Sequence, residues 1–122
     1  MQQYDPWNHA EKLGVSIIEW PLRTAKGMWV PEQRAIFIRP KMRSFVELSV
    51  LAHELVHAEY CDPAGHHPKN EARANRIAAQ RLINPREIAE LLRLYPDGDR
   101  ICRELGVTRE IFQAYLDTGE VA

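Results

Sequence analysis

Apolar residues with helical spacing run through the middle of the chain and predict its longest helix, over about residues 45–60. The stripe consists of Leu48, Leu51, Ala52, Leu55 and Val56. Ser44 and Glu47 precede it in the arrangement of a capping box, with serine at the N-cap and glutamate three residues later. Pro63 cannot continue a helix, so we expect this helix to end near residue 60.

Upstream of this helix, short runs rich in β-branched and aromatic residues predict three strands. They are expected at residues 15–20, 28–30 and 34–38. Pro31-Glu32-Gln33 separates the last two runs, which therefore indicate a hairpin. A short helix over about residues 6–13 precedes the strands and ends at Gly14, because glycine is suited to helix C-termini. We expect a small, three-stranded antiparallel sheet.

The rest of the chain is predicted to be helical. Helices are expected at about residues 68–83, 85–94, 99–105 and 109–117. Asn84-Pro85 has the form of an N-cap followed by proline at the first helical position, and Gly106 and Thr108 separate the last two helices as C-terminal and N-terminal caps. The pattern predicts an α+β fold in which the sheet packs on a helical body.

The length of 122 residues fits a single domain, so we expect residues 1–122 to share one fold. Within it, residues 1–96 form the core, and residues 97–122 form two helices with a helix-turn-helix outline packed on that core. A DNA-binding role for this outline is disfavoured, because residues 97–122 contain six acidic and only three basic side chains. The net charge of the whole chain, −1, likewise predicts no direct partner among nucleic acids or anionic membranes.

The cysteines and the N-terminal residues indicate the cellular compartment in which the protein is expected. Cys61 and Cys102 lie far apart in the sequence and do not form a disulfide framework. No apolar segment resembles a signal peptide or a membrane span. We therefore expect a cytoplasmic protein.

The candidate chemistry lies in the long predicted helix, at His53-Glu54-Leu55-Val56-His57. Residues four apart differ by about 40° around a helix and by about 6 Å along it, so both imidazoles can bind one ion. Glu54 points about 100° away from His53, where it can reach a water on that ion and serve as its general base. The sequence thus predicts a zinc-dependent hydrolase-like site with His53 and His57 as ligands and Glu54 as the catalytic carboxylate.

A third metal ligand is needed, and Glu71 on the next predicted helix is the best candidate. It lies 14 residues after His57, a gap that permits the first helix to end and the chain to return through a loop. Asn75 lies one turn later on the same face and is expected to orient a ligand imidazole through a hydrogen bond. The sequence leaves alternatives open for the third ligand. These are Cys61, Asp62, His66 and His67.

At these residues the chain resembles the ImmA/IrrE family of metallopeptidases. The resemblance is carried by the His53–His57 motif, by Glu71-x-x-Ala74-Asn75-x-x-Ala78-Ala79 and by Leu82-Ile83-Asn84-Pro85, and it covers roughly residues 8–85. Val56, Ile77 and Asn84 depart from the residues that are usual in the family. None of these departures removes a chemical group from the site.

The resemblance implies a zincin-like core in which His53, His57 and Glu71 hold one Zn²⁺ and Glu54 acts in catalysis. It also implies a protein substrate, a helix-turn-helix transcriptional repressor of a phage or mobile element. The alternatives are a non-catalytic repressor-binding protein with a structural zinc site and, less favoured, a DNA-binding module. The oligomeric state is not indicated by the sequence.

Three further expectations concern the surroundings of the site. Stabilisation of a developing oxyanion requires a donor besides the metal, and the candidates are Tyr60, His66, His67 and Tyr95. An exposed edge of the sheet is expected to accept a substrate segment as an added strand. Trp20 and Trp29 are interpreted as packing residues, and Arg73, Arg76 and Arg81 as a solvated face.

Overall fold

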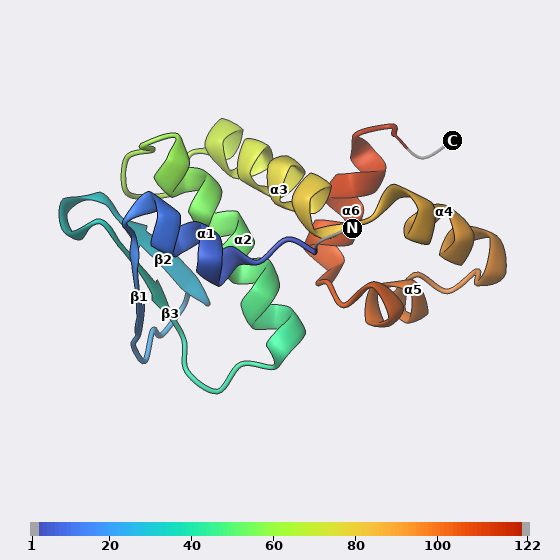
Figure 1. Ribbon diagram of the computed structural model, residues 1–122, viewed down its shortest axis with the longest axis horizontal. Helices are drawn as coiled ribbons and strands as arrows, with labels where there is room; N and C mark the ends of the chain where they lie inside the picture. Colours follow the sequence, from blue (N-terminus) through green and yellow to red (C-terminus); the bar gives the residue numbers. More distant parts are fainter. Residues whose placement is uncertain (1–2, 121–122) are drawn as a thin grey trace.

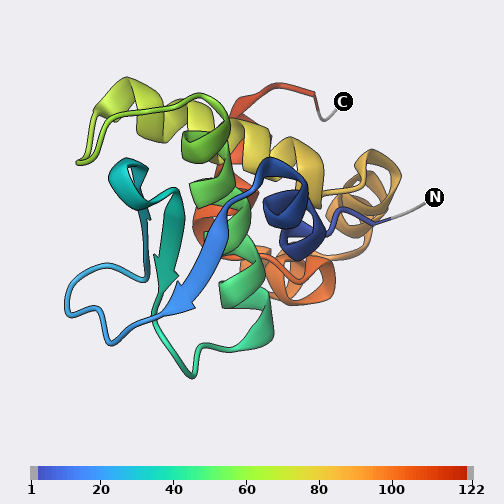
Figure 2. The same ribbon diagram turned by 60° about the vertical axis from the view of Figure 1, so that its left-hand side comes forward.

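The computed structural model describes residues 3–120, which form six α-helices, one 3-10 turn and a three-stranded sheet (Figures 1 and 2). The elements are α1 (Pro6–Leu13), β1 (Ser16–Glu19), β2 (Gly27–Val30), η1 (Pro31–Gln33), β3 (Ala35–Ile38), α2 (Ser44–Glu59), α3 (Pro68–Leu82), α4 (Pro85–Leu94), α5 (Gly98–Leu105) and α6 (Arg109–Asp117). The α+β class predicted from the sequence is confirmed, and each predicted helix and strand is present with small shifts at its ends.

The sheet is mixed, so the prediction of an antiparallel sheet was wrong for one of its two strand pairs. The strand order is β1-β3-β2, with β2 antiparallel to β3 and β1 parallel to it. The β3 run is almost entirely apolar and buried, so it takes the centre and needs a partner on each side. Residues 20–26 therefore cross from one side of β3 to the other, a connection that hydrophobic alternation does not reveal.

Helix α2 lies between two hydrophobic cores. Leu51, Leu55 and Ala58 pack with the sheet and α1, whereas Ala52 packs with the helices that follow. Because apolar partners lie on both sides, α2 is apolar over most of its surface. Figure 2 shows α2 running behind the sheet and in front of the C-terminal helices. Its remaining face is free to carry polar groups.

Local capping signals predicted most helix ends correctly, with one exception. Gly14 and Gly106 end their helices with φ of 70° and 74°, and the Asn84 side chain accepts hydrogen bonds from the first backbone amides of α4. The capping box at Ser44 is not formed. The N-cap of α2 is Arg43, which makes no side-chain capping bond, so Ser44 already lies inside the first turn.

The C-terminal helices contact both the core and α2. Helix α6 packs on α3, and the turn between α5 and α6 is held to α2 by a hydrogen bond from the Thr108 amide to Ser49 Oγ at 3.2 Å. Ser49 is buried and lies four residues before His53 on α2. The last two helices are thereby fixed close to the HExxH motif.

The prediction that both tryptophans are packing residues is confirmed fully for Trp29 and only in part for Trp20. Trp29 is buried, as predicted, and its indole donates to the Asp62 carbonyl at 3.1 Å. Trp20 is 57% exposed and packs edge-to-face on Phe37 at the surface of the sheet rather than in the core. Cys61 and Cys102 are both free thiols. Among residues 3–120, no helix combines the length and the apolar character required to span a bilayer.

Candidate metal centre

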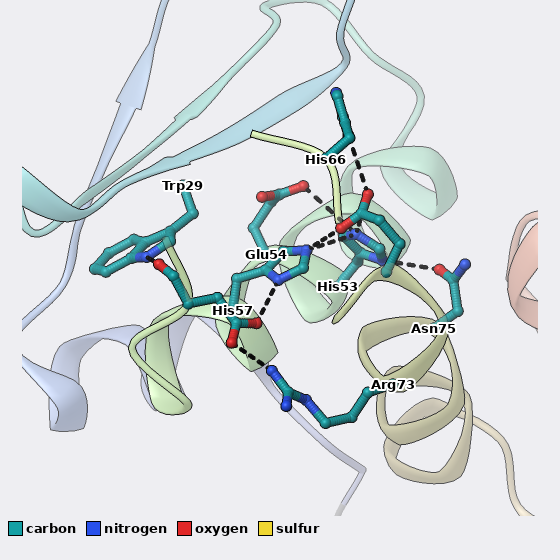
Figure 3. A network of polar contacts seen from close by, with 9 residues as sticks. Trp29, His53, Glu54, His57, His66, Arg73 and Asn75 are labelled. Carbon is teal, nitrogen blue, oxygen red and sulfur yellow. Dashed lines mark hydrogen bonds and ion pairs between the residues drawn. The ribbon is translucent and has the colours of Figure 1, made fainter. Parts of the chain in front are cut away.

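Two helices bring three metal-binding side chains together. His53 and His57 extend from successive turns of α2, and their Nε2 atoms lie 3.2 Å apart. Glu71 comes from the first turn of α3, with one carboxylate oxygen 2.5 Å from His57 Nε2 and the other 3.5 Å from His53 Nε2. One ligand atom from each of the three residues lies within 4.8 Å of the other two. Figure 3 shows the side chains of His53 and His57 close together, with that of Glu54 beside them.

The opposite nitrogen of each imidazole is held by a separate partner. Nδ1 of His53 lies 2.8 Å from Oδ1 of Asn75 (Figure 3), and Nδ1 of His57 lies 2.8 Å from Oδ2 of Asp62. A carboxylate and an amide oxygen can only accept, so both imidazoles donate through Nδ1–H. In the neutral ring this leaves a bare lone pair on each Nε2, directed into the centre.

This donor set fits a divalent cation. Two Nε2 lone pairs and a carboxylate converge, and all of them are acceptors that repel one another unless a positive charge lies between them. Two imidazoles and one carboxylate are also a ligand set that zinc takes in catalytic sites, where a fourth position stays open. His53, His57 and Glu71 are therefore the residues that would hold the ion.

Glu54 lies beside the three donors without joining them. Its carboxylate oxygen is 3.9 Å from His53 Nε2, and the residue is 9% exposed. Burial raises the pKa of Glu54 to about 7, and the negative charge of Glu71 acts in the same direction against the lowering effect of His53. A carboxylate in this range exchanges protons readily near neutral pH, as a general base requires.

The carboxylate of Glu71 is tuned in the opposite direction. Burial alone would raise its pKa, but electrostatic interaction with the imidazoles of His53 and His57 and a hydrogen bond from His66 outweigh that effect and hold the pKa below its usual value. Nδ1 of His66 lies 3.3 Å from Oε1 of Glu71. Glu71 is thus anionic at neutral pH, which is the state that binds a cation.

Behind His57, Asp62 holds the imidazole and does not join the metal donors, although the sequence leaves it open as a third ligand. Its carboxylate lies on the Nδ1 side of His57 and also pairs with Arg73. Arg73 in turn stacks on Tyr60, with its guanidinium carbon 4.1 Å from the ring centroid. The only signal in the sequence was the position of Asp62, in the turn that follows the metal helix.

Two of the three arginines assigned to a solvated face are instead paired. Arg73 supports Asp62, and Arg81 pairs with Glu59 of α2 at 2.7 Å. Both side chains are 26% exposed, whereas Arg76 lies on the surface as predicted. The pairs join α3 to the end of α2, which fixes the angle at which Glu71 approaches the two histidines.

Two recesses open beside the metal donors. A small one of about 80 Å³ is lined by residues of β2, by Glu54, His57 and Glu71, and by the loop after α2. A larger one of about 340 Å³ lies on the His53 side and also includes Thr108 and Ile111. Gly27 and Glu54 line both, so edge strand β2 and the candidate base stand where the recesses meet.

The strand β2 approaches α2 closely at this point. A Cβ at Gly27 would lie 2.4 Å from Cγ1 of Val50 and 3.3 Å from Cγ of Glu54. Only glycine lets the edge of the sheet come this near to the helix. The proximity places the free edge of β2 beside the donors, as the expected strand-addition site requires.

Of the four candidates for oxyanion stabilisation, only His66 lies at the site. It lines both recesses, and its side chain is 85% exposed although it contacts Glu71. Tyr60 is held under Arg73, His67 is an exposed residue at the start of α3, and Tyr95 contacts Arg100 after α4. None of these last three is among the residues that line the two recesses.

Comparison with known families supports the site described above. The model of the peptidase M78 family, described as the IrrE N-terminal-like domain, matches residues 10–117 and so covers both helices of the centre and the C-terminal helices. A search of the curated proteins finds no match to this chain. Because the family model covers most of the chain, and because the two histidines, Glu54 and Glu71 occupy one site, this chain belongs to the M78 family of metallopeptidases.

Proposed function

We propose that this chain is a zinc-dependent endopeptidase that hydrolyses a peptide bond in a protein substrate, a helix-turn-helix repressor of a phage or mobile element. The observation that carries the proposal is the position of Glu54. It is buried beside three converging metal donors, yet lines both recesses at the free edge of β2. A site that only stored a structural metal would need neither a spare carboxylate nor an open side.

The metal supplies Lewis acidity, because a divalent cation held by neutral nitrogens and one carboxylate lowers the pKa of its water and polarises a carbonyl. The chain's residues supply the rest. His53, His57 and Glu71 fix the position of the ion. Glu54 takes the proton of the attacking water at its carboxylate and passes it to the nitrogen of the departing amine. Both transfers use the same carboxylate, so the reaction needs no covalent intermediate with the protein.

His66 is proposed as the side chain that faces the developing negative charge on the carbonyl oxygen. It lies at the mouth of the site and is exposed, so it can turn toward a bound peptide while its neighbour Glu71 remains a ligand. A donor placed where charge develops typically contributes about 10²–10³ in kcat. A peptide added to the free edge of β2 would pass directly over Glu54.

The test is incubation of the zinc-loaded protein with purified helix-turn-helix repressors from the same genome, followed by mass spectrometry of the products. The wild type is expected to give one cleavage in the repressor, and Glu54→Gln is expected to retain zinc and lose about 10²–10⁴ in rate. Loading with Mn²⁺ in parallel shows which metal supports the reaction. An intact repressor recovered in a stable complex with wild-type protein would contradict peptidase activity.

A further inference from the structure

A groove leads away from the metal centre between α3 and α6. The 340 Å³ recess beside His53 shares Asn75 and Glu110 with a recess of about 590 Å³ that is lined only by α3, α6 and the residue after α6. The two recesses are therefore neighbours and adjoin at Asn75 and Glu110. We call the larger recess the α3–α6 groove, and define it by Ala72, Asn75 and Arg76 of α3 and Glu110, Gln113 and Ala114 of α6.

The inner end of the groove is one side chain away from a metal-binding imidazole. Asn75 lines the groove and is also the residue that holds Nδ1 of His53. Figure 3 shows Asn75 on the opposite side of His53 from Trp29, which belongs to β2. The small recess, the 340 Å³ recess and the groove thus follow one another, joined first by Gly27 and Glu54 and then by Asn75 and Glu110.

The lining of the groove is suited to a peptide rather than to a nucleic acid. Arg76 and Arg109 are balanced by Glu110 and Asp117, and Arg109 is already paired with Asp99 at 2.5 Å. A phosphate backbone needs a surplus of positive charge, which this lining lacks. The oxygen of Asn75 holds His53, which leaves its amide nitrogen to donate to a peptide carbonyl. Gln113 donates one N–H to Asp117 Oδ1 at 3.0 Å and keeps a second N–H and its oxygen for a peptide. Small alanines on both helices leave room for a main chain.

We propose that the α3–α6 groove binds the part of a polypeptide substrate that continues from the scissile bond on one side. The inference rests on the proposed peptidase function and extends it by giving α6 a direct role in substrate binding. The volume of the groove lies within the range of sites that enclose ligands, about 300–1,000 Å³. The enzyme therefore reads a longer stretch of its substrate than the residues next to the cleaved bond.

The consequence is a one-sided dependence on substrate length. A peptide that is extended toward the groove gains contacts, whereas an extension of equal length on the other side does not. One or two additional hydrogen bonds to the groove correspond to about tenfold in kcat/KM. The ratio of kcat/KM for the long and short peptides on the same enzyme measures this gain, and partial unfolding cancels from the ratio.

The experiment begins with the zinc-loaded full chain and a library of random peptides about 20 residues long, with cleavage sites read by mass spectrometry. The best-cleaved sequence is then synthesised as a short peptide of about eight residues and as two long peptides, each extended on one side. We expect about a tenfold higher kcat/KM for one extension only. Equal rates for all three peptides, or equal gains from both extensions, would overturn the proposal.

Two variants place a large side chain in the groove without touching the metal donors. Gln113→Trp on α6 and Arg76→Trp on α3 are each expected to reduce the ratio for the favoured extension to about one. Glu90→Trp, at an exposed position of α4 outside the groove, is the matched control and keeps the wild-type ratio. If the ratio of kcat/KM for long and short peptides stays near tenfold in both groove variants, the length dependence does not arise from the groove and the proposal is contradicted.

Binding to the Glu54→Gln protein separates this proposal from the proposed activity. The peptides for this test are chosen by binding and not by cleavage: the random library is captured on zinc-loaded Glu54→Gln, and the tightest binder is synthesised with a fluorescent label at full length and shortened from either end. Titration with zinc-loaded Glu54→Gln, read by anisotropy, gives the affinity ratio of the long to each short peptide. If the wild type cleaves no peptide but binding shows the one-sided gain, the groove stands and the peptidase function fails. If peptides are cleaved but neither rate nor affinity depends on one-sided length, the peptidase function stands and the groove proposal fails.

Discussion

The carboxylate of Asp62 holds Nδ1 of His57 at 2.8 Å and so directs the other nitrogen of the ring toward Glu71. Asp62 is 6% exposed, and its second oxygen pairs with Arg73. The ring is thus fixed from behind before any ion binds. An equivalent contact from Asn75 fixes His53, but through a neutral amide.

Replacing Asp62 should therefore weaken metal binding without removing a ligand. We expect Asp62→Ala to lower zinc affinity by about 10–100-fold, because the histidine loses both its orientation and a partner that increases its basicity. Asp62→Asn, which still accepts the hydrogen bond, should lose less. Competition with a fluorescent zinc chelator measures both. Unchanged affinity in Asp62→Ala, with circular dichroism showing a folded protein, would mean that the contact does not orient the ligand.

Gly27 should not tolerate a side chain. A methyl group there would overlap Cγ1 of Val50, at 2.4 Å from the new Cβ, and would push β2 away from Glu54. We expect Gly27→Ala to lower the free energy of unfolding by about 1–3 kcal/mol, the usual effect of overpacking. Urea denaturation measures the change.

Val50→Ala provides the matched test of that explanation. If the clash is with Val50, the double variant Gly27→Ala, Val50→Ala should be more stable than the sum of the two single effects predicts. Additive effects would show that the loss at Gly27 arises from something other than this contact.

The hydrogen bond from Thr108 to Ser49 should hold the C-terminal helices against α2. Ser49→Ala leaves the Thr108 amide without its partner in a half-buried position, so we expect a loss of about 1–3 kcal/mol in the free energy of unfolding. Hydrogen exchange followed by NMR should show faster exchange at Thr108 in the variant. Exchange at the wild-type rate would indicate that packing of α6 on α3 is sufficient by itself.

Zinc should stabilise the fold by mass action. At a free zinc concentration about 100 times the dissociation constant, the free energy of unfolding should rise by about 2.7 kcal/mol. Thermal unfolding with zinc and with a chelator measures the shift. Glu54→Gln should respond as the wild type does, since Glu54 is not a ligand, and equal stability of the wild type with and without zinc would argue against a specific site.

The sequence predicted those parts of the structure that are encoded locally. The helix end at Gly14, the Asn84 cap and the motif face of α2 depend on residues within a few positions of one another, so spacing and propensity were sufficient. Glu71 is predicted as a donor from its distance of 14 residues after His57 on the next helix, and the structure brings it to His53 and His57.

The features that the sequence did not reveal depend on distant contacts. The parallel pairing of β1 with β3 follows from which strand is most buried, and β2 intervenes between the two in the chain. The pairing of Arg73 with Asp62 and the contact of Thr108 with Ser49 join separate elements. The identity of a charged or hydroxyl residue does not indicate which distant residue it contacts, so these contacts could not be predicted from the sequence. The capping box at Ser44 failed for the converse reason, since a local motif was present but the helix begins at that serine.

The metal content of the purified protein and of two variants tests most directly whether three side chains from α2 and α3 hold one ion. Elemental analysis by mass spectrometry after dialysis against zinc is expected to give about one zinc per chain for the wild type and for Glu54→Gln. The Glu71→Ala protein should retain a small fraction of that amount. A wild type that binds no zinc, or a Glu71→Ala protein that keeps a full equivalent, would contradict the assignment of this centre.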